Sequence, residues 1–153
     1  MALYLVQHGK NLPKDADPEK GLSEEGRQEV ARIADMAAKA GLAVSAIVHS
    51  GKKRAAQTAE IFAAALSPAG GVKQADGLAP LDDVAAYAEK IDPEQNTMLV
   101  GHLPFMEKMT SYLITGDAER TVFKFQNGGI VSLDKDEDSG RWMITGALLP
   151  SFG

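Results

Sequence analysis

Two histidines and one arginine stand at points in the sequence where their side chains could act together. His8 follows an apolar run over residues 2–6, and His102 follows another over residues 97–100. Arg54 lies in the first turn of a predicted helix. A neutral imidazole is a competent nucleophile near neutral pH, and a guanidinium beside the N–H groups of a helix start attracts anions. These residue types therefore indicate a site for a phosphate group.

The elements that must position these residues alternate along the chain. Short apolar runs predict strands, and apolar residues at helical spacing predict helices between them. The expected strands are residues 2–6, 44–48, 72–76 and 97–100, and the expected helices are residues 24–40, 54–66, 82–91 and 104–114. The last two runs, residues 129–133 and 142–149, predict a closing hairpin around a charged turn.

Strands that alternate with helices predict a three-layer α/β/α fold. Its sheet is mainly parallel, is covered by helices on both faces, and ends in a C-terminal antiparallel hairpin. Ligands of such sheets bind at the carboxyl ends of the strands. Three polar clusters fall at that edge, namely Gln7-His8-Gly9, residues 49–54 and Gly101-His102. The topology therefore predicts that His8 and His102 meet although they are far apart in the sequence.

A metal site is the alternative interpretation of this edge, because a third histidine, His49, falls there as well. Three imidazoles can ligate a zinc ion. However, His8, His49 and His102 lack the close spacing of known ligand sets, and Arg54 would repel a cation. We therefore expect no metal and no other cofactor, and we expect a structural role for His49.

The composition is that of an ordinary globular protein of 153 residues, which we expect to form one domain over residues 1–153. The formal net charge of −5 disfavours nucleic acids and acidic membrane surfaces as partners. The sequence has no cysteine, which excludes disulfides, cysteine-type zinc sites and thiol nucleophiles. We find no signal-peptide pattern and no apolar run of membrane-spanning length, and we expect a cytoplasmic protein.

Four motifs stand in order along nearly the whole chain. They are Gln7-His8-Gly9, Lys20 to Gly26, Ser50 to Thr58, and Gly101 to Pro104. These motifs resemble the Arg-His-Gly, Arg-Pro-Leu-Thr-x-x-Gly, Ser-x-x-x-Arg-Ala-x-Gln-Thr and Gly-His-x-Pro segments of the histidine phosphatase superfamily. The third motif fits at every defined position. The chain thus looks like a phosphoglycerate-mutase-like protein, and within that superfamily it is similar to the short phosphohistidine phosphatases of the SixA type.

The resemblance implies a role for each matching residue. His8 would be the nucleophile that forms a transient phosphohistidine, while Arg54 and His102 would hold the phosphate oxygens and stabilise their charge. The substrate implied is phosphohistidine on a protein, such as the histidine-containing phosphotransfer domain of a signalling relay. A phosphate or sulfate ion is expected to bind in the same site. No metal is implied.

Gln7 departs from the family pattern, which has arginine at this position. A glutamine side chain offers neutral N–H donors, so it can keep a contact to phosphate but loses a charge-assisted, bidentate one. Lys10 or Lys20, in the loop that follows, could restore part of the missing charge. The alternative interpretation is a pseudophosphatase that binds phosphate or a phosphoprotein, in which Gln7 marks the loss of catalysis.

A second departure concerns the leaving group. Relatives that cleave phosphomonoesters carry an acid after the third strand to protonate an alkoxide, whereas this chain has Leu78-Ala79-Pro80 there. An imidazole, with a pKa of about 6.5, leaves readily without such an acid. The sequence therefore favours phosphohistidine over sugar phosphates. The alternative is a low-specificity phosphomonoesterase in which Asp83 supplies the proton.

Overall fold

In the computed structural model, which describes residues 1–152, the strands form one sheet in the order β3-β2-β4-β1-β5-β6. The strands are β1 Ala2–Gln7, β2 Ala46–His49, β3 Val72–Gln74, β4 Thr97–Gly101, β5 Ile130–Lys135 and β6 Trp142–Leu148. The helices are α1 Glu24–Lys39, α2 Lys53–Leu66, α3 Val84–Ala88, α4 Phe105–Thr115 and the short 3₁₀ helix η1 Pro150–Phe152.

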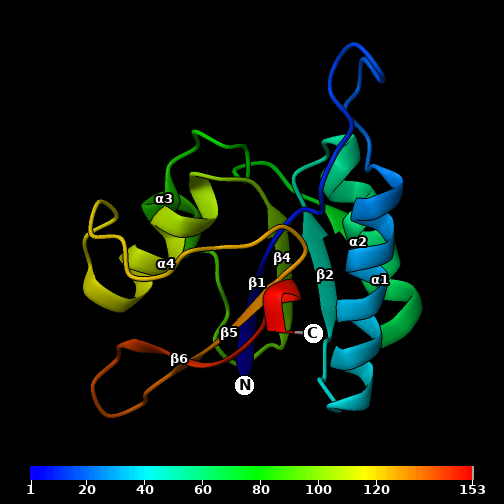
Figure 1. Ribbon diagram of the computed structural model, residues 1–153. Helices are drawn as coiled ribbons and strands as arrows, with labels where there is room; N and C mark the ends of the chain where they lie inside the picture. Colours follow the sequence, from blue (N-terminus) through cyan, green and yellow to red (C-terminus); the bar gives the residue numbers. More distant parts are fainter. Residues whose placement is uncertain (153) are drawn as a thin grey trace.

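The sheet is mixed in the way that the sequence predicts. Strands β3, β2, β4 and β1 pair in parallel, and β5 pairs antiparallel with both β1 and β6. Helices α1 and α2 cover one face, and α3 and α4 cover the other (Figure 1). The prediction of a three-layer α/β/α fold with a C-terminal antiparallel hairpin is therefore confirmed. No helix within residues 1–152 is long and apolar enough to cross a membrane.

Strand β1 lies near the middle of the sheet and contributes to both cores. Its side chains alternate between faces, as in any strand. Tyr4 and Val6 pack under α1 and α2, while Leu3 and Leu5 pack under α3 and α4. Burial on both faces explains why this run is apolar throughout. It also fixes the register of the strand, and therefore the position of the residues that follow it.

Two helices begin later than their sequences predict. Helix α3 starts at Val84 because Asp83 is its N-cap, and it ends at Ala88 in a tight turn, well short of Ile91. Pro93 follows soon afterwards, and a proline disfavours a helical conformation in the residue before it. Helix α4 starts at Phe105, so Pro104 precedes the helix rather than opening it.

Helix α1 begins against the loop that follows β1. The Ser23 side chain caps the helix by accepting a hydrogen bond from the N–H of Gly26 at 3.0 Å. The backbone N–H of Ser23 donates to the carbonyl oxygen of Lys10 at 3.0 Å. A Cβ on Gly26 would lie 2.1 Å from that same oxygen. Only glycine therefore lets the loop approach the first turn of α1 this closely.

Replacing Gly26 by alanine should destabilise the protein, although alanine usually favours a helix by about 1 kcal/mol. The added methyl group must displace the rigid backbone at Lys10, so we expect a loss of about 2 kcal/mol in the free energy of unfolding. Urea denaturation measures this loss. Gly146→Ala is the control, because a Cβ there meets nothing within 4 Å. Equal stability of the two variants would contradict the close approach.

Candidate functional site

The candidate site lies at the carboxyl ends of two neighbouring parallel strands. His8 follows β1 and His102 follows β4. The backbone N–H of His8 donates to the carbonyl oxygen of Gly101 at 2.9 Å, which joins the two strand ends. The ring centroids of the two histidines are 5.1 Å apart, with the planes tilted by 52°. The structure therefore brings His8 and His102 together, as the topology predicts.

The ring of His8 is fixed in one tautomer by two partners. Its Nδ1 lies 2.7 Å from the carbonyl oxygen of Gly9, which can only accept, so Nδ1 carries the proton. Its Nε2 accepts a hydrogen bond from Nε of Arg54 at 3.3 Å, so Nε2 holds the lone pair. The ring is otherwise buried. His8 therefore presents a free electron pair on Nε2 beside a guanidinium group.

The second histidine is more deeply buried and contacts a hydroxyl group. His102 is 1% exposed, and its Nε2 lies 2.6 Å from Oγ of Ser50. Its Nδ1 has no hydrogen-bond partner among residues 1–152. A hydroxyl group can donate or accept, so this contact suits either neutral tautomer of His102. Ser50 opens the third sequence motif, and the structure places it at the edge of the site.

Burial lowers the pKa of both histidines. The pKa of His8 falls to about 4, mainly because burial disfavours the charged imidazolium, and also because Arg54 and Lys20 repel it. The pKa of His102 falls to about 3, again mainly through burial, with smaller effects of His8, Arg54 and Lys52. Both rings are therefore neutral near pH 7. The charge in the site comes from the basic side chains around them.

The start of α2 concentrates positive charge beside His8. Lys52 is the N-cap and makes no side-chain capping bond, and the first turn holds no acidic residue. Of the basic residues there, Lys53 pairs with Asp17 at 2.9 Å. Within residues 1–152, Arg54 has no such partner, and its burial lowers the pKa of its guanidinium group. The helix dipole adds to this positive field, so a bound anion would be stabilised here.

Two further residues hold the backbone around His8. Thr58, which is fully buried, accepts a hydrogen bond from the N–H of Gly9 at 3.0 Å and donates to the carbonyl oxygen of Arg54 at 2.8 Å. Asn127 donates from Nδ2 to the carbonyl oxygen of His8 at 3.0 Å. Thr58 ends the third sequence motif. Asn127 is not among the residues that the sequence predicts for the site, because no local pattern marks its contact with a residue so distant in the chain.

The residues near the altered motif differ in what they can contribute. Gln7 ends β1 and is half-buried. Lys10 lies 2.9 Å from Glu25 and 3.4 Å from Glu29, so its charge is already balanced. Lys20, in contrast, is close enough to His8 to help lower its pKa. Of the two lysines that the sequence offers, Lys20 is therefore the one whose charge acts on the site.

His49 lies at the same edge but serves the local backbone. Its Nδ1 accepts a hydrogen bond from the N–H of Gly51 at 3.0 Å, which supports the structural role expected from the sequence. Burial lowers its pKa as well. Within residues 1–152, no group of three or more histidine, aspartate or glutamate side chains is arranged to hold a metal ion.

Asp83, the residue that the sequence offers as a proton donor, has a structural partner. Its Oδ1 accepts a hydrogen bond from the N–H of Ala85 at 3.0 Å and so caps α3. It also lines a groove that includes Ser50. Asp83 thus shares a groove with Ser50, and its carboxylate caps a helix.

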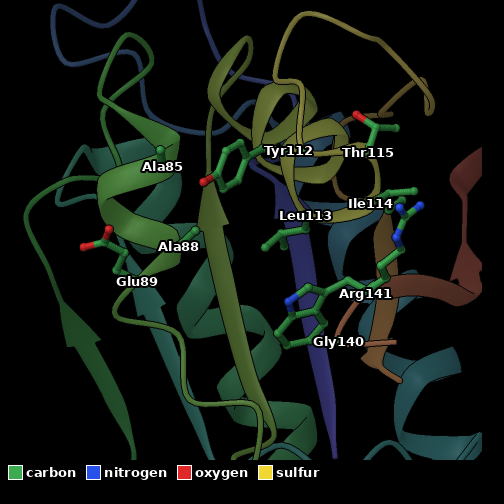
Figure 2. A pocket seen from close by; sticks show the side chains of 11 residues that line it. Ala85, Ala88, Glu89, Tyr112, Leu113, Ile114, Thr115, Gly140 and Arg141 are labelled. Carbon is green, nitrogen blue, oxygen red and sulfur yellow. The ribbon is translucent and has the colours of Figure 1, made fainter. Parts of the chain in front are cut away.

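A separate groove lies away from these residues. It has a volume of about 440 Å³ and lies between α3, the second half of α4 and the start of β6 (Figure 2). Its lining includes Tyr112, Arg141 and Trp142, and neither histidine of the pair nor Arg54. Helix α4 starts at the edge that carries His102 and ends at this groove. The groove therefore belongs to the opposite end of the sheet.

The fold and the two adjacent imidazoles define a class of protein. A three-layer α/β/α sheet with a histidine after its central first strand is the phosphoglycerate-mutase-like architecture of the histidine phosphatases. The model of the histidine phosphatase superfamily (branch 1) matches residues 3–82, and the chain belongs to this superfamily. No curated protein matches the sequence.

Solved structures agree with this assignment over almost the full length of the chain. The protein histidine phosphatase SixA in complex with tungstate has a TM-score of 0.85, with 23% identity and 99% of each chain covered. A proposed phosphohistidine phosphatase SixA from Agrobacterium tumefaciens has a TM-score of 0.78, with 28% identity and 97% of each chain covered. A mycobacterial glucosyl-3-phosphoglycerate phosphatase with VO3 has a TM-score of 0.74, with 17% identity and coverage of 95% and 97%.

Nitrogen NMR of the histidine rings should show that His8 titrates near pH 4, as the proton-bearing Nδ1 tautomer, and that His102 titrates near pH 3. Each histidine has a pKa of about 6.5 in the unfolded chain, so the folded state binds fewer protons than the unfolded state between about pH 3 and pH 6.5. The free energy of unfolding should therefore rise with pH over this window. Arg54→Gln should raise the pKa of His8, whereas Arg27→Gln, on the exposed part of α1, should not. Titration of His8 near pH 6.5 would contradict the buried, neutral pair.

Proposed function

We propose that the protein is a phosphohistidine phosphatase that hydrolyses phosphohistidine on a protein, without a metal ion, through a covalent intermediate on His8. The observation that carries this proposal is the fixed tautomer of His8, which holds its Nε2 lone pair beside Arg54. The similar structures that bind tungstate and VO3 support a site for phosphate-like oxyanions, including phosphate and sulfate. The resemblance to SixA proteins supports a phosphorylated nitrogen as the bond that is cleaved.

The reaction has two steps. In the first, the lone pair on Nε2 of His8 attacks phosphorus, the P–N bond of the substrate breaks, and the substrate imidazole leaves with its electron pair and takes up a proton from solvent. In the second, water attacks phosphorus, the bond to Nε2 breaks, and phosphate is released. Arg54 and His102 donate hydrogen bonds to the phosphoryl oxygens, and the Gln7 side chain adds a neutral donor.

The surroundings of the leaving group favour cleavage of a P–N bond. The stretch Leu78-Ala79-Pro80 carries no acid, and the exposed Asp76 lies between it and the end of β3. Asp82 and Asp83 come next, and each accepts a hydrogen bond from a backbone N–H, at 2.9 and 3.0 Å. Their carboxylates thus have structural tasks at the start of α3. An imidazole needs less protonation than an alkoxide to leave, so the site suits phosphohistidine better than an alkyl phosphate.

The openness of the site edge supports a protein substrate. The connections from β2 to α2 and from β4 to α4 are short, and within residues 1–152 no separate cap domain is inserted at this edge (Figure 1). A bulky partner can therefore approach the histidine pair. A histidine-containing phosphotransfer domain is the kind of partner that we propose.

Phosphate release should be at least about a hundredfold faster from a phosphohistidine protein than from glycerol 3-phosphate, because no general acid assists an alkoxide. Both rates are measured at equal concentration by a phosphate assay. His8→Ala should abolish release, and phosphorus NMR of acid-sensitive phosphoenzyme should detect the intermediate only when His8 is present. His49→Asn is the matched control and should keep most of the activity. Faster release from the alkyl phosphate, lost in Asp83→Asn, would establish the phosphomonoesterase instead.

Gln7→Arg should accelerate phosphate release by about tenfold or more, because one charge-assisted donor to the transferring phosphoryl group is worth up to a hundredfold. The rate constant is measured in single-turnover experiments, so that product release does not mask it. Release by Gln7→Arg but not by the natural sequence would identify a pseudophosphatase. An unchanged rate in an active protein would show that residue 7 does not contact phosphate.

A further inference from the structure

A groove leads away from the candidate site on the side of Ser50. It has a volume of about 460 Å³ and is lined by residues 75–79, by Asp82 and Asp83, and by one face of α3. Ser50 lines the groove and lies 2.6 Å from Nε2 of His102 through its Oγ. The groove therefore begins within one hydrogen bond of the histidine pair. The part of a substrate that is attached to a phosphoryl group at the histidine pair would therefore lie next to this groove.

The groove carries an excess of negative charge. Asp76, Asp82 and Asp83 line it, against a single basic residue, Lys90. The ammonium group of Lys90 lies over the ring of Tyr87, 5.9 Å from its centroid, so it is drawn to one wall. The lining of the groove therefore has a net negative charge, which would attract a ligand with positive charge.

Two of these carboxylates are held in place before any ligand binds. Oδ2 of Asp82 accepts a hydrogen bond from the N–H of Ala79, and Oδ1 of Asp83 accepts one from the N–H of Ala85. Each leaves its second oxygen for another donor. Because the side chains are already ordered, binding a cation costs little additional conformational entropy.

The charge reverses across the site. Lys20 and Lys52 act on His8 and His102, where the phosphoryl group would bind, and the groove on the other side of Ser50 is acidic. A ligand that fits both parts has a phosphate at one end and positive charge close beside it. A sugar phosphate lacks that positive charge.

We infer that this groove binds lysine or arginine side chains that flank the phosphorylated histidine in the substrate protein. The inference rests on the proposed function, and it adds the chemistry that distinguishes one phosphoprotein from another. Leu81, which directly precedes Asp82 in the sequence, is 86% exposed, so it offers the partner an apolar contact beside this charge. The protein should therefore bind and hydrolyse a phosphohistidine with basic neighbours better than one with acidic neighbours.

The test uses two peptides that carry phosphohistidine between lysines or between glutamates. The value of kcat/KM for phosphate release should be about tenfold higher for the lysine peptide, as expected for two or three exposed ion pairs. Added salt should reduce this ratio, because it screens exposed charges. A ratio near one, or a ratio that salt does not change, would overturn the inference.

Charge reversal at Asp76 is the sharpest variant. Asp76 is exposed and lies outside β3 and α3, so Asp76→Lys should fold normally, and it should lower the ratio by about fivefold. Asp138→Lys is the control with the same change in charge. Asp138 lies in the turn between β5 and β6 and does not line the groove. The kcat/KM ratio of this variant should match that of the natural sequence. An equal change of the ratio in the two variants would mean that only the net charge of the protein matters, which would overturn the inference that the groove binds basic side chains.

Binding separates this inference from the proposed function. Calorimetry with peptides that carry a stable phosphonate analogue of phosphohistidine measures the preference without turnover. Tighter binding of the lysine peptide supports the groove even if no phosphate is released, in which case the proposed phosphatase activity fails alone. Equal binding of both peptides overturns the groove, even if both phosphohistidine peptides are hydrolysed.

Discussion

The hydrogen bond between Nδ1 of His8 and the carbonyl oxygen of Gly9 is the contact on which the site depends. It assigns the proton to one ring nitrogen and leaves the electron pair on the other. The backbone around His8 is itself held by hydrogen bonds. Gly101 fixes the N–H of His8, Asn127 fixes its carbonyl, and Thr58 fixes the N–H of Gly9. A ring attached to so constrained a backbone has one orientation, and chemistry at Nε2 needs that orientation.

Two buried neutral imidazoles lie beside one positively charged guanidinium group, so the three side chains together carry a net positive charge. Each ring avoids the cost of carrying a proton in a buried position, and Arg54 holds the positive charge for both. An oxyanion between these groups would receive hydrogen bonds and balance the charge at the start of α2. The same burial keeps Nε2 of His8 free of protons. One physical property, the exclusion of water, thus serves both binding and nucleophilicity.

The sequence predicts those parts of the structure that are encoded locally. The central strands are continuous apolar runs, and the motif from Ser50 to Thr58 places Arg54 at a helix start. His8 and His102 each follow one of these strands, so their proximity follows from the predicted parallel sheet. Asn127 could not be predicted in this way, because its bond to His8 depends on how β5 lies beside β1. The choice between Lys10 and Lys20 also required the structure, since the ion pairs of Lys10 form across a loop. Helix α3 is short because its cap and a tight turn outweigh its apolar pattern.

The place of β1 in the sheet also has a consequence for biosynthesis. Leu3 pairs with Thr97 on one side, and Ala2 pairs with Asp134 on the other. The strand that carries His8 is therefore made long before either of its neighbours, and its edges stay unpaired until both have been translated. Closing such long loops is slow, and unpaired strand edges invite association with other chains. A truncated chain that stops before β5 would keep His8 but would leave one edge of its strand unpaired.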